Sequence, residues 1–392
     1  MKIVVATLAR PRGHTGVQTH FQAALEYWHA KGVAAELVTP FSKYGLLASL
    51  VFGVRRLVGR ISPSIDVWWY EYWHFWFLRL ALRRVLQAEP DAVIYAQSPL
   101  AARAALDARK VGRQKVTAAV HFNISQAEEW ASQVGLPRDG RVYRSIRKRE
   151  AAILPSVDGL VYVSNFAKSQ IEQAIPRTQN VPSLVLPNFV ARSERHGSAT
   201  PSRDLISIGT LEPRKNQAYL LRVLAEAAQR GRRYSLTLVG DGADRKKLEA
   251  LAASLGVTSQ VAFAGSCDNV RELLRGHRVF VHSALRESFG IALVEAMAEG
   301  LPICAGPVGG IVEAFSDGQE GFYWDLDAAS AGAETLIALM ETPGLRQTMA
   351  EAALARFEAS YETSKVAGRL TDFILGMCGK PEVVPAGALV NR

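Results

Sequence analysis

A regular alternation of short apolar runs with amphipathic segments constrains the fold of this chain more than any other feature. In the first half, strands are predicted where β-branched and other apolar residues cluster, at residues 3–6, 33–38, 92–96, 117–121, 159–163 and 181–186. Helix-like segments such as residues 17–31 separate these runs. Buried strands that alternate with helices are typical of a parallel sheet covered by helices on both faces.

The alternation stops at residues 191–204, which are polar and lack apolar periodicity, and we interpret this stretch as a linker. It then restarts, with strands predicted at 205–208, 235–239, 260–263, 279–282 and 302–305 and helices at about 216–230, 244–255, 268–275, 291–299 and 329–341. The sequence therefore predicts an α/β protein with two Rossmann-like, doubly wound domains in tandem and a cleft between them. A length of 392 residues suits two such domains, which we place at 1–190 and 205–379, followed by a poorly ordered tail at 380–392.

The basic charge of the chain is confined to its first half. Residues 1–195 hold 26 Lys and Arg against 14 Asp and Glu, whereas the remainder holds 20 against 23. This imbalance favours an anionic partner for the first half, and nucleic acid, a phosphorylated acceptor and an anionic membrane surface all fit that description. A merely basic surface is the alternative. The three cysteines show no paired or metal-ligand spacing, which indicates a reducing compartment and argues against a zinc site.

The sequence does not predict a membrane span. The apolar run at residues 1–9 is short and meets Arg10 at once, without a cleavage pattern, so we interpret it as a first buried strand rather than a signal peptide. No uncharged apolar stretch of about 18 residues follows it. We therefore expect a cytoplasmic protein.

Charged residues and glycines gather in the loops that follow the strands of the second half. Arg214 and Lys215 follow the strand at 205–208 and precede a helix, an arrangement that favours an anion such as a diphosphate. Gly240, in a Gly-Asp-Gly turn after the next strand, would let a ligand approach the backbone closely. A solvated cation pair and a tight turn are the alternative interpretations of these two loops when each is taken alone.

A third loop carries two glutamates eight positions apart. Glu287 precedes a helix, Gly290 frees the backbone at the helix entrance, and Glu295 lies about one turn inside it. The start of a helix offers unpaired N–H groups to a phosphate, and a carboxylate accepts hydrogen bonds from paired sugar hydroxyls. Simple loop geometry would explain any one of these segments. A fourth junction, the glycine-lined segment at 306–313, makes coincidence a poor explanation of the set.

In order and spacing, these segments resemble the C-terminal domain of family 4 glycosyltransferases, which have the two-Rossmann-domain GT-B fold. The matching pieces are the Arg-Lys loop, the Gly-Asp-Gly turn, the Glu-x7-Glu segment at 287–295 and the Gly-Gly-x-x-Glu stretch at 309–313. The resemblance covers about residues 205–325. It implies retaining transfer of a hexose-type sugar from a UDP- or GDP-linked donor, with no metal and no other cofactor. It also implies that the last helix packs back on the N-terminal domain.

The resemblance assigns roles to individual residues. It implies that Arg214 and Lys215 neutralise the donor diphosphate, that Glu287 holds sugar hydroxyls, and that Glu295 binds the ribose. It further implies sugar or phosphate contacts for Ser288, Phe289, Gly290 and Ile291. One position departs from the pattern, since Thr210 stands where many members have Arg. The resemblance then implies that Arg214 supplies the positive charge of the missing arginine.

The first half contributes fewer recognisable site residues. The loop at 13–20 is similar to the family's glycine-rich loop, with Gly16 at its last glycine, and it does not fit the dinucleotide-binding pattern. Gly16 would let the acceptor and the donor phosphate approach each other. His121 ends a strand at the place where the family contacts the donor sugar near the reacting centre, although a histidine at a strand end is also a common structural residue. We expect a structural role for His20.

The segment at 67–77 holds four of the seven tryptophans and is followed by several arginines. Indole rings next to arginines suit a membrane interface. Alternatively, aromatics at 69, 73 and 76, or at 68, 72 and 75, could form one buried helical stripe. We favour a glycan or lipid-linked acceptor, as in polysaccharide, lipopolysaccharide or glycolipid synthesis, with peripheral contact at the inner face of an anionic membrane.

Two other classes of function are compatible with parts of the sequence. A GT-B epimerase or a phosphorylase-like enzyme would share the architecture and would release epimerised nucleotide sugar or free sugar phosphate without an acceptor. A basic nucleic-acid-binding module would explain the charge of the first half but not the ordered loops of the second. We therefore expect no nucleic-acid partner.

Overall fold

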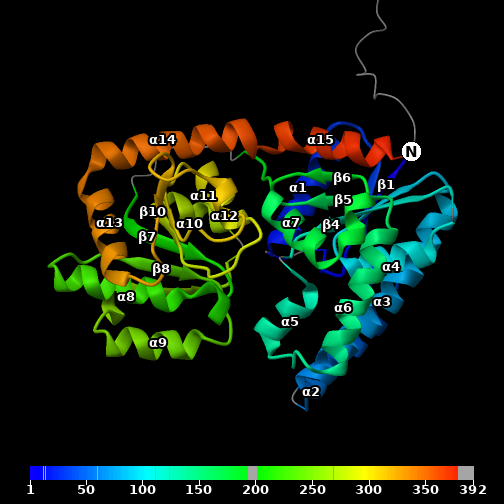
Figure 1. The fold of residues 1–392 in the computed structure, drawn as a ribbon, viewed down its shortest axis with the longest axis horizontal. Coiled ribbons are helices and arrows are strands. Elements are labelled where there is room, and N and C mark those ends of the chain that lie inside the picture. Colours follow the sequence, from blue (N-terminus) through cyan, green and yellow to red (C-terminus); the bar gives the residue numbers. More distant parts are fainter. Residues whose placement is uncertain are drawn as a thin grey trace, which may run out of the picture.

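A computed structural model of the chain contains two six-stranded parallel sheets, one after the other along the sequence (Figure 1). It describes residues 1–377 except 12, 14, 60, 111, 123, 193–200 and 268. Most of the stretch interpreted as a linker, Cys378 and the tail predicted at 380–392 lie outside the described residues. The GT-B arrangement of two Rossmann-like domains is confirmed.

The first sheet has the strand order β2-β1-β3-β4-β5-β6, and each predicted strand is found within two residues of its expected bounds. Its strands are β1 (Ile3–Ala6), β2 (Ala35–Val38), β3 (Val93–Ala96), β4 (Lys115–Val120), β5 (Gly159–Tyr162) and β6 (Ser183–Val185). The accompanying helices are α1 (Gly16–Ala30), α2 (Phe41–Val58), α3 (Pro63–Ala88), α4 (Pro99–Ala108), α5 (Gln126–Val134), α6 (Arg141–Ile153) and α7 (Asn165–Ala174).

The second sheet has the order β12-β11-β10-β7-β8-β9. Its strands are β7 (Arg203–Ile208), β8 (Leu236–Val239), β9 (Val261–Gly265), β10 (His277–His282), β11 (Ile303–Ala305) and β12 (Gly321–Tyr323). Its helices are α8 (Gln217–Gln229), α9 (Arg245–Ser254), α10 (Val270–Arg275), α11 (Ile291–Ala298), α12 (Ile311–Ala314) and α13 (Ala329–Glu341). The sequence analysis missed β12 because this strand is only three residues long and begins at a glycine. A Cβ at Gly321 would lie 1.8 Å from the carbonyl oxygen of Ile303 on the neighbouring strand, so only glycine fits there.

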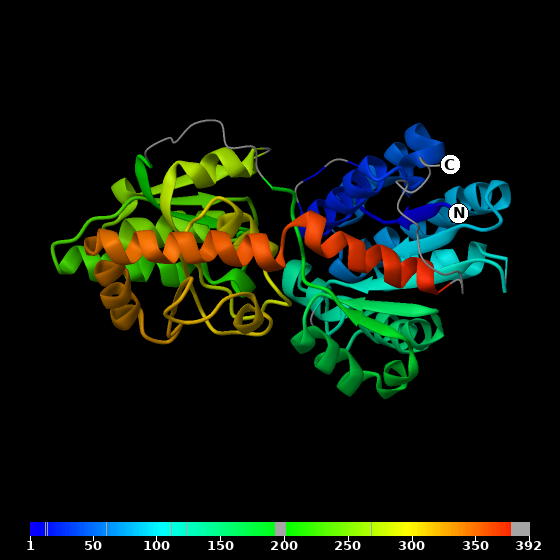
Figure 2. The same ribbon diagram turned by 90° about the horizontal axis from the view of Figure 1, so that it is seen from above.

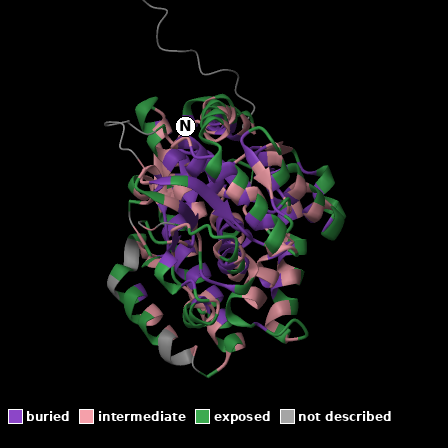
Figure 3. Cartoon of the chain, turned by 90° about the vertical axis from the view of Figure 1, so that its left-hand side faces the viewer, coloured by how far each residue is buried: buried purple, intermediate pink, exposed green. Residues whose placement is uncertain are grey.

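Both sheets are covered on both faces, as the apolar composition of their strands requires. In β1, Val4 and Ala6 pack in a core with α3 and α4, whereas Ile3 and Val5 pack in a core with α1. All four residues are fully buried, and Figure 3 shows that buried residues, in purple, gather in the middle of the molecule. A parallel sheet buried in this way needs apolar residues at successive positions, which is why the strands could be located from sequence.

The last two helices join the domains. α14 (Pro343–Ser360) lies along the second domain and α15 (Thr363–Gly376) returns to the first, as both Figure 1 and Figure 2 show. Leu370 and Ile374 of α15 lie in the core that contains α1, and the indole of Trp28 donates a hydrogen bond to Thr371 at 2.8 Å. The chain thus crosses between the domains twice, and the two crossings meet where Val190 bridges to Glu362.

The tryptophan-rich segment forms the middle of α3, and its interpretation as one buried stripe is wrong. Trp68, Tyr72 and Trp76 are 51%, 43% and 37% exposed, whereas Phe75 and Phe77 are buried. The helical repeat therefore divides the aromatics between two faces, one against the domain and one toward solvent. Among the described residues, no helix has the length and apolar character needed to cross a bilayer.

Candidate active site

Three loops of the second domain meet because their strands are neighbours in the sheet. β7 lies between β10 and β8, so the loops after these strands leave the same edge. The first loop contains Lys215 in a single 3-10 turn (Pro213–Lys215), followed by Asn216 in the left-handed conformation with φ of 51°. The loop after β10 is tied to it, since the Ser283 hydroxyl donates to the carbonyls of Lys215 and Asn216 at 3.0 and 2.9 Å.

Glu287 lies at the centre of a charge cluster in these loops. Its carboxylate forms a short ion pair with Lys215 Nζ, and Arg214 Nη1 lies 3.8 Å away. Burial alone would raise the pKa of Glu287, but Lys215 and the other positive groups hold it far below the usual carboxyl value. Glu287 is therefore ionised at any physiological pH, and it orients the Lys215 ammonium group before a substrate arrives.

Arg214 has a second partner that the sequence analysis did not identify. The Glu212 carboxylate accepts hydrogen bonds from Arg214 Nη2 and Nε at 2.7 and 3.1 Å. Glu212 is buried, so this pair fixes the guanidinium against the loop. The positive charge of Arg214, expected to replace the arginine that is missing at position 210, is therefore largely neutralised by Glu212 before a donor binds. Glu287 interacts with both Arg214 and Lys215.

A cavity of about 520 Å³ between the domains brings the predicted residues together. From the second domain it is lined by Gly240, Arg214, Lys215, Glu287, Ser288, Phe289, Gly290, Ile291 and Glu295. From the first domain it is lined by Gly16 and His121, among others. The Phe289 ring itself is buried against Tyr361, so Phe289 faces this cavity mainly through its backbone.

Gly16 and Ile291 approach each other across the domain boundary. A Cβ at Gly16 would lie 2.8 Å from Cγ2 of Ile291, which is closer than carbon atoms can pack. Gly290 precedes α11 with φ of 89°, a conformation that favours glycine. Gly16 therefore allows α1 to approach Ile291 across the cleft, and Gly290 allows the turn into α11.

His121 is held in one orientation by a neighbouring amide. Its Nε2 lies 3.1 Å from Gln97 Oε1, so the ring donates from Nε2 and leaves Nδ1 as an acceptor. Burial lowers the pKa of His121 to about 4, and the ring is neutral. The buried His20 ring packs edge-on against it at 5.0 Å and bonds to the Tyr95 hydroxyl at 2.9 Å. The arrangement makes His20 a support for His121.

Glu295 and Glu129 are the two carboxyl groups of this cavity that titrate near neutrality. Burial raises the pKa of Glu295 to about 7, with Arg271 opposing the rise. Burial also raises the pKa of Glu129 to about 7, and Arg214 opposes that rise across the cleft. The sequence analysis missed Glu129, because α5 shows only ordinary amphipathic spacing and nothing local places its side chain opposite Arg214.

The stretch at 309–313 joins the two domains beside the site through hydrogen bonds. The Glu313 carboxylate accepts hydrogen bonds from the backbone N–H groups of Asn165 and Phe166 at 2.8 and 2.7 Å, at the start of α7. The Ser164 hydroxyl donates to the carbonyl of Ser288 at 2.6 Å, and the Ser288 hydroxyl donates to the carbonyl of His121 at 3.1 Å. These bonds couple the loop that carries Glu287 to the first domain.

Each of the two domains matches a known protein family in sequence. The family described as "Glycosyltransferase Family 4" matches residues 14–194, and "Glycosyl transferases group 1" matches residues 191–356. The chain belongs to the family 4 glycosyltransferases of the GT-B fold. The two matches meet at the stretch interpreted as the linker and together include all the residues that line the interdomain cavity.

This family 4 member is similar in sequence to several curated glycosyltransferases. It is 33% identical over 131 residues to N-acetyl-alpha-D-glucosaminyl L-malate synthase of Bacillus anthracis, a match that covers 33% of the chain and 34% of the relative. It is 31% identical over 241 residues to phosphatidyl-myo-inositol mannosyltransferase of Mycobacterium tuberculosis, which covers 57% and 62%. The matched region spans about a third of the length of the first curated relatives.

The fold is similar to solved GT-B structures along nearly the whole chain. The structure of Anabaena HepE in complex with UDP-glucose matches with a TM-score of 0.69 at 18% identity, over 96% of this chain and 100% of the other. Sucrose-phosphate synthase from Thermosynechococcus elongatus matches with a TM-score of 0.72 at 14% identity, over 96% and 98%. At these identities the likeness concerns the fold.

Proposed function

We propose that the protein is a retaining glycosyltransferase that needs no metal ion and moves a hexose-type sugar from a UDP- or GDP-linked donor to an acceptor hydroxyl. The acceptor belongs to cell-envelope polysaccharide, lipopolysaccharide or glycolipid synthesis. One observation carries the proposal: Lys215 and Arg214 surround an ionised Glu287 at the strand ends of the second domain, opposite His121 of the first. Cations for a diphosphate and a carboxylate for sugar hydroxyls are the groups that such a donor requires.

The names of relatives and structural neighbours support this class of donor and acceptor. The relatives include a lipopolysaccharide core glycosyltransferase of Rhizobium meliloti and the mycobacterial mannosyltransferase that acts on phosphatidyl-myo-inositol. The structure of HepE holds UDP-glucose. We extend a nucleotide-sugar donor and an envelope-related acceptor to this chain on the strength of the shared family and the charge cluster around Glu287.

In the proposed reaction, the bond between the anomeric carbon and the donor phosphate oxygen breaks as the acceptor oxygen bonds to the same face. The acceptor proton passes to the leaving diphosphate, whose growing negative charge is stabilised by Lys215 and Arg214. His121 is neutral and is held by Gln97, so it serves as a hydrogen-bonding group for the sugar rather than as a base. Glu295 accepts hydrogen bonds from the ribose.

A thermal-shift screen with UDP-, GDP- and ADP-sugars tests the donor site. We expect one nucleotide to raise the melting temperature by several degrees, because a ligand at about 100 times its Kd stabilises the native state by about 2.7 kcal/mol. No stabilisation by any of the three would contradict the proposal. The anomeric configuration of the product, measured by NMR, tests retention. Release of free sugar phosphate or of an epimerised nucleotide sugar without an acceptor would favour the phosphorylase-like or epimerase alternative.

Donor affinity is expected to rise with pH because of Glu295. In the free protein the pKa of Glu295 is about 7, and ribose hydroxyls donate to the ionised form, so binding releases a proton. Affinity for the UDP-sugar or GDP-sugar should therefore increase about tenfold between pH 6 and pH 8 and level off above that. Calorimetry at three pH values measures this change.

The matched variant for the pH experiment is Glu295→Gln, which cannot ionise. Glu129 also titrates near pH 7, but a bound diphosphate opposes its ionisation and acts in the opposite direction. The ratio of wild-type to E295Q affinity therefore isolates the contribution of Glu295. An equal pH slope in both proteins would contradict a ribose-binding role for this residue.

The exposed face of α3 supports peripheral contact with an anionic membrane. Trp68, Tyr72 and Trp76 follow one another at i, i+4 and i+8, and the exposed Arg83 and Arg84 lie about two turns further on. α2, which packs against α3, exposes Leu47, Leu50 and Val54. Indole rings and arginines on one face are the composition of helices that lie in the headgroup region.

Replacing Trp68 and Trp76 together by alanine is expected to weaken binding to phosphatidylglycerol vesicles about tenfold or more, because two indole rings leave the interface. Co-sedimentation with vesicles measures the change. Val312→Ala, which removes an exposed apolar side chain from the second domain, should bind as the wild type does. Unchanged vesicle binding by the double variant would show that this face does not contact the membrane.

A further inference from the structure

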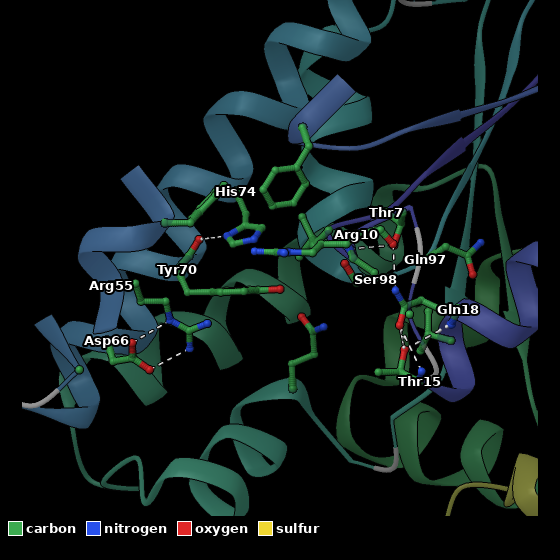
Figure 4. Close-up of a pocket in the computed structure, with 18 residues that line it drawn as sticks. Thr7, Arg10, Thr15, Gln18, Arg55, Asp66, Tyr70, His74, Gln97 and Ser98 are labelled. Carbon is green, nitrogen blue, oxygen red and sulfur yellow. Dashed lines mark hydrogen bonds and ion pairs between the residues drawn. The ribbon is translucent and has the colours of Figure 1, made fainter. Parts of the chain in front are cut away.

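A second cavity, larger than the interdomain one, lies within the first domain. Its volume is about 910 Å³, and it is enclosed by the loop after β1, by α2 and by α3 (Figure 4). Thr15 and Val17 line both cavities. Gln97 lines the second cavity and contacts His121, which lines the interdomain one, at 3.1 Å. A molecule that fills this space therefore contacts Gln97, the residue that holds the His121 ring.

One wall of the cavity is aromatic and carries a free hydroxyl. The Tyr70 ring stacks on His74 at 3.7 Å between centroids, and its hydroxyl group points into the cavity in Figure 4. In the described part of the chain, no residue forms a hydrogen bond with this hydroxyl. Burial raises the pKa of Tyr70 to about 12, so the hydroxyl remains a donor. The Arg55 guanidinium also lies over this ring, 4.6 Å from its centre, so Tyr70 offers the cavity its hydroxyl rather than an open ring face. A buried hydroxyl of this kind suits the hydroxyl groups of a sugar or polyol.

The charges at the cavity do not balance. Arg55 forms a bidentate ion pair with Asp66 at 2.7 and 2.8 Å, and Asp66 is the one acidic residue among those that line the cavity. Arg10 also lines it, with its guanidinium 5.5 Å from the ring centre of Phe41 and directed toward His74 (Figure 4). Within the described residues, Arg10 has no carboxylate at ion-pair distance.

His74, toward which Arg10 is directed, is neutral and does not change the charge of the cavity. Burial lowers the pKa of His74 to about 3, and its Nδ1 lies 2.7 Å from the carbonyl of Tyr70, so the ring is neutral and donates there. Among the described residues that line the cavity, the positive charge of Arg10 is therefore the one without a carboxylate partner. A guanidinium that lines a cavity and has no carboxylate partner there is suited to bind a phosphate group.

We propose that this cavity binds the acceptor and that the acceptor carries a phosphate ester, which pairs with Arg10 while the sugar or polyol part accepts a hydrogen bond from the Tyr70 hydroxyl. This inference rests on the proposed glycosyl transfer and specifies the chemical class of its acceptor. Two sources supply that chemistry: a soluble sugar phosphate and the head group of an anionic phospholipid. The acceptor hydroxyl would extend past Thr15 toward His121.

Calorimetry on the full-length protein saturated with UDP tests the soluble source, because UDP occupies the donor site. Glucose 6-phosphate should bind at least tenfold more tightly than glucose. Arg10→Gln should weaken glucose 6-phosphate binding by about tenfold or more, the loss expected for one charge-assisted hydrogen bond, without changing glucose binding. Arg113→Gln is the matched control. It removes one exposed positive charge next to the amino end of β4, at the opposite edge of the sheet, and should bind as the wild type does.

The lipid source gives a different pattern. In that case glucose 6-phosphate binds no better than glucose, but binding to phosphatidylglycerol vesicles falls about tenfold in Arg10→Gln while binding to phosphatidylcholine vesicles is unchanged. Tyr70→Phe, which keeps the ring and every charge, should weaken the same phosphate probe to a smaller degree. It provides a second test if Arg10→Gln folds poorly.

The proposal is overturned if Arg10→Gln binds both phosphate probes as the wild type does, or if neither probe binds more tightly than its uncharged counterpart. Competition between glucose 6-phosphate and UDP would also overturn it, because the phosphate would then occupy the diphosphate site. Failure here is separate from failure of the proposed function. Stabilisation by a nucleotide sugar, with no dependence of the acceptor on Arg10, rejects only the assignment of this cavity.

Discussion

Replacing Lys215 by alanine is expected to reduce sugar transfer by about 10³-fold while the fold is retained. Lys215 is the ammonium group closest to Glu287 in the donor site, and a single preorganised donor aimed at developing charge contributes about 10²–10³ in rate. The loss should appear in binding as well as in catalysis, because the diphosphate is charged in the ground state too. Initial rates with the donor found by thermal shift, together with UDP or GDP calorimetry, measure both effects.

The control for this variant is Lys247→Ala in the same domain. The Lys247 side chain is 78% exposed and pairs with Asp244 at the start of α9, so its removal changes net charge by the same amount without touching the site. K247A should retain full activity, and far-UV circular dichroism should be the same for both variants. A folded K215A with more than a tenth of the wild-type rate would reject the assignment of Lys215 to the diphosphate.

Glu287→Gln is expected to separate sugar recognition from nucleotide recognition. The change removes a charged acceptor from two sugar hydroxyls, and each such hydrogen bond contributes about 1.5–3 kcal/mol, so transfer should fall by about 100-fold or more. The bare nucleoside diphosphate should bind at least as tightly as to the wild type. The reason is that Lys215 and Arg214 lose the internal carboxylate that competes with phosphate for them.

Calorimetry with UDP or GDP and with the corresponding nucleotide sugar distinguishes these effects in one protein. In the wild type the sugar adds affinity, whereas in E287Q the two ligands should bind alike. Loss of bare nucleotide binding by E287Q would mean that Glu287 acts only by holding Lys215 and Arg214 in place. Compared with K215A, which should lose the nucleotide itself, E287Q tests whether the carboxylate contacts the sugar.

The fold could be predicted closely from sequence because burial on both faces of a parallel sheet leaves a strong local signal. Successive apolar residues as in Ile3–Ala6 marked the strands, and polar residues at 191–204 marked the interruption. The loops of the donor site were visible for a similar reason. Gly240 at the end of β8 and Gly290 at the start of α11 adopt backbone conformations that other residues avoid.

The remainder depended on contacts between segments far apart in sequence. The sequence placed Lys215 and Glu287 in two strand-end loops of one domain, but the ion pair between them depends on the pairing of β7 with β10 in the sheet. The carboxylate of Glu129 approaches Arg214 only because α5 faces the second domain. Burial in that assembled cleft raises the pKa of Glu129, and no property of residues 126–134 indicates it.

The buried and exposed aromatic residues of α3 show the same limit of prediction from sequence within one helix. The sequence showed that residues 67–77 are strongly aromatic, but not which aromatics would face the protein, since a ring packs equally well in a core or at an interface. Packing against α2 and α4 decided that Phe75 and Phe77 are buried and that Trp68 and Trp76 are exposed.

By itself, the sequence determined two parallel α/β domains and a set of strand-end loops with the charges of a nucleotide-sugar site. Those features follow from local backbone preference and from the burial of each strand. Only the tertiary structure decided that Glu313 caps a helix of the other domain, that Glu212 neutralises Arg214, and that Arg10 remains unmatched at a second cavity. The physical reason is that a charge acquires its partners, and therefore its chemistry, when distant segments of the chain pack together.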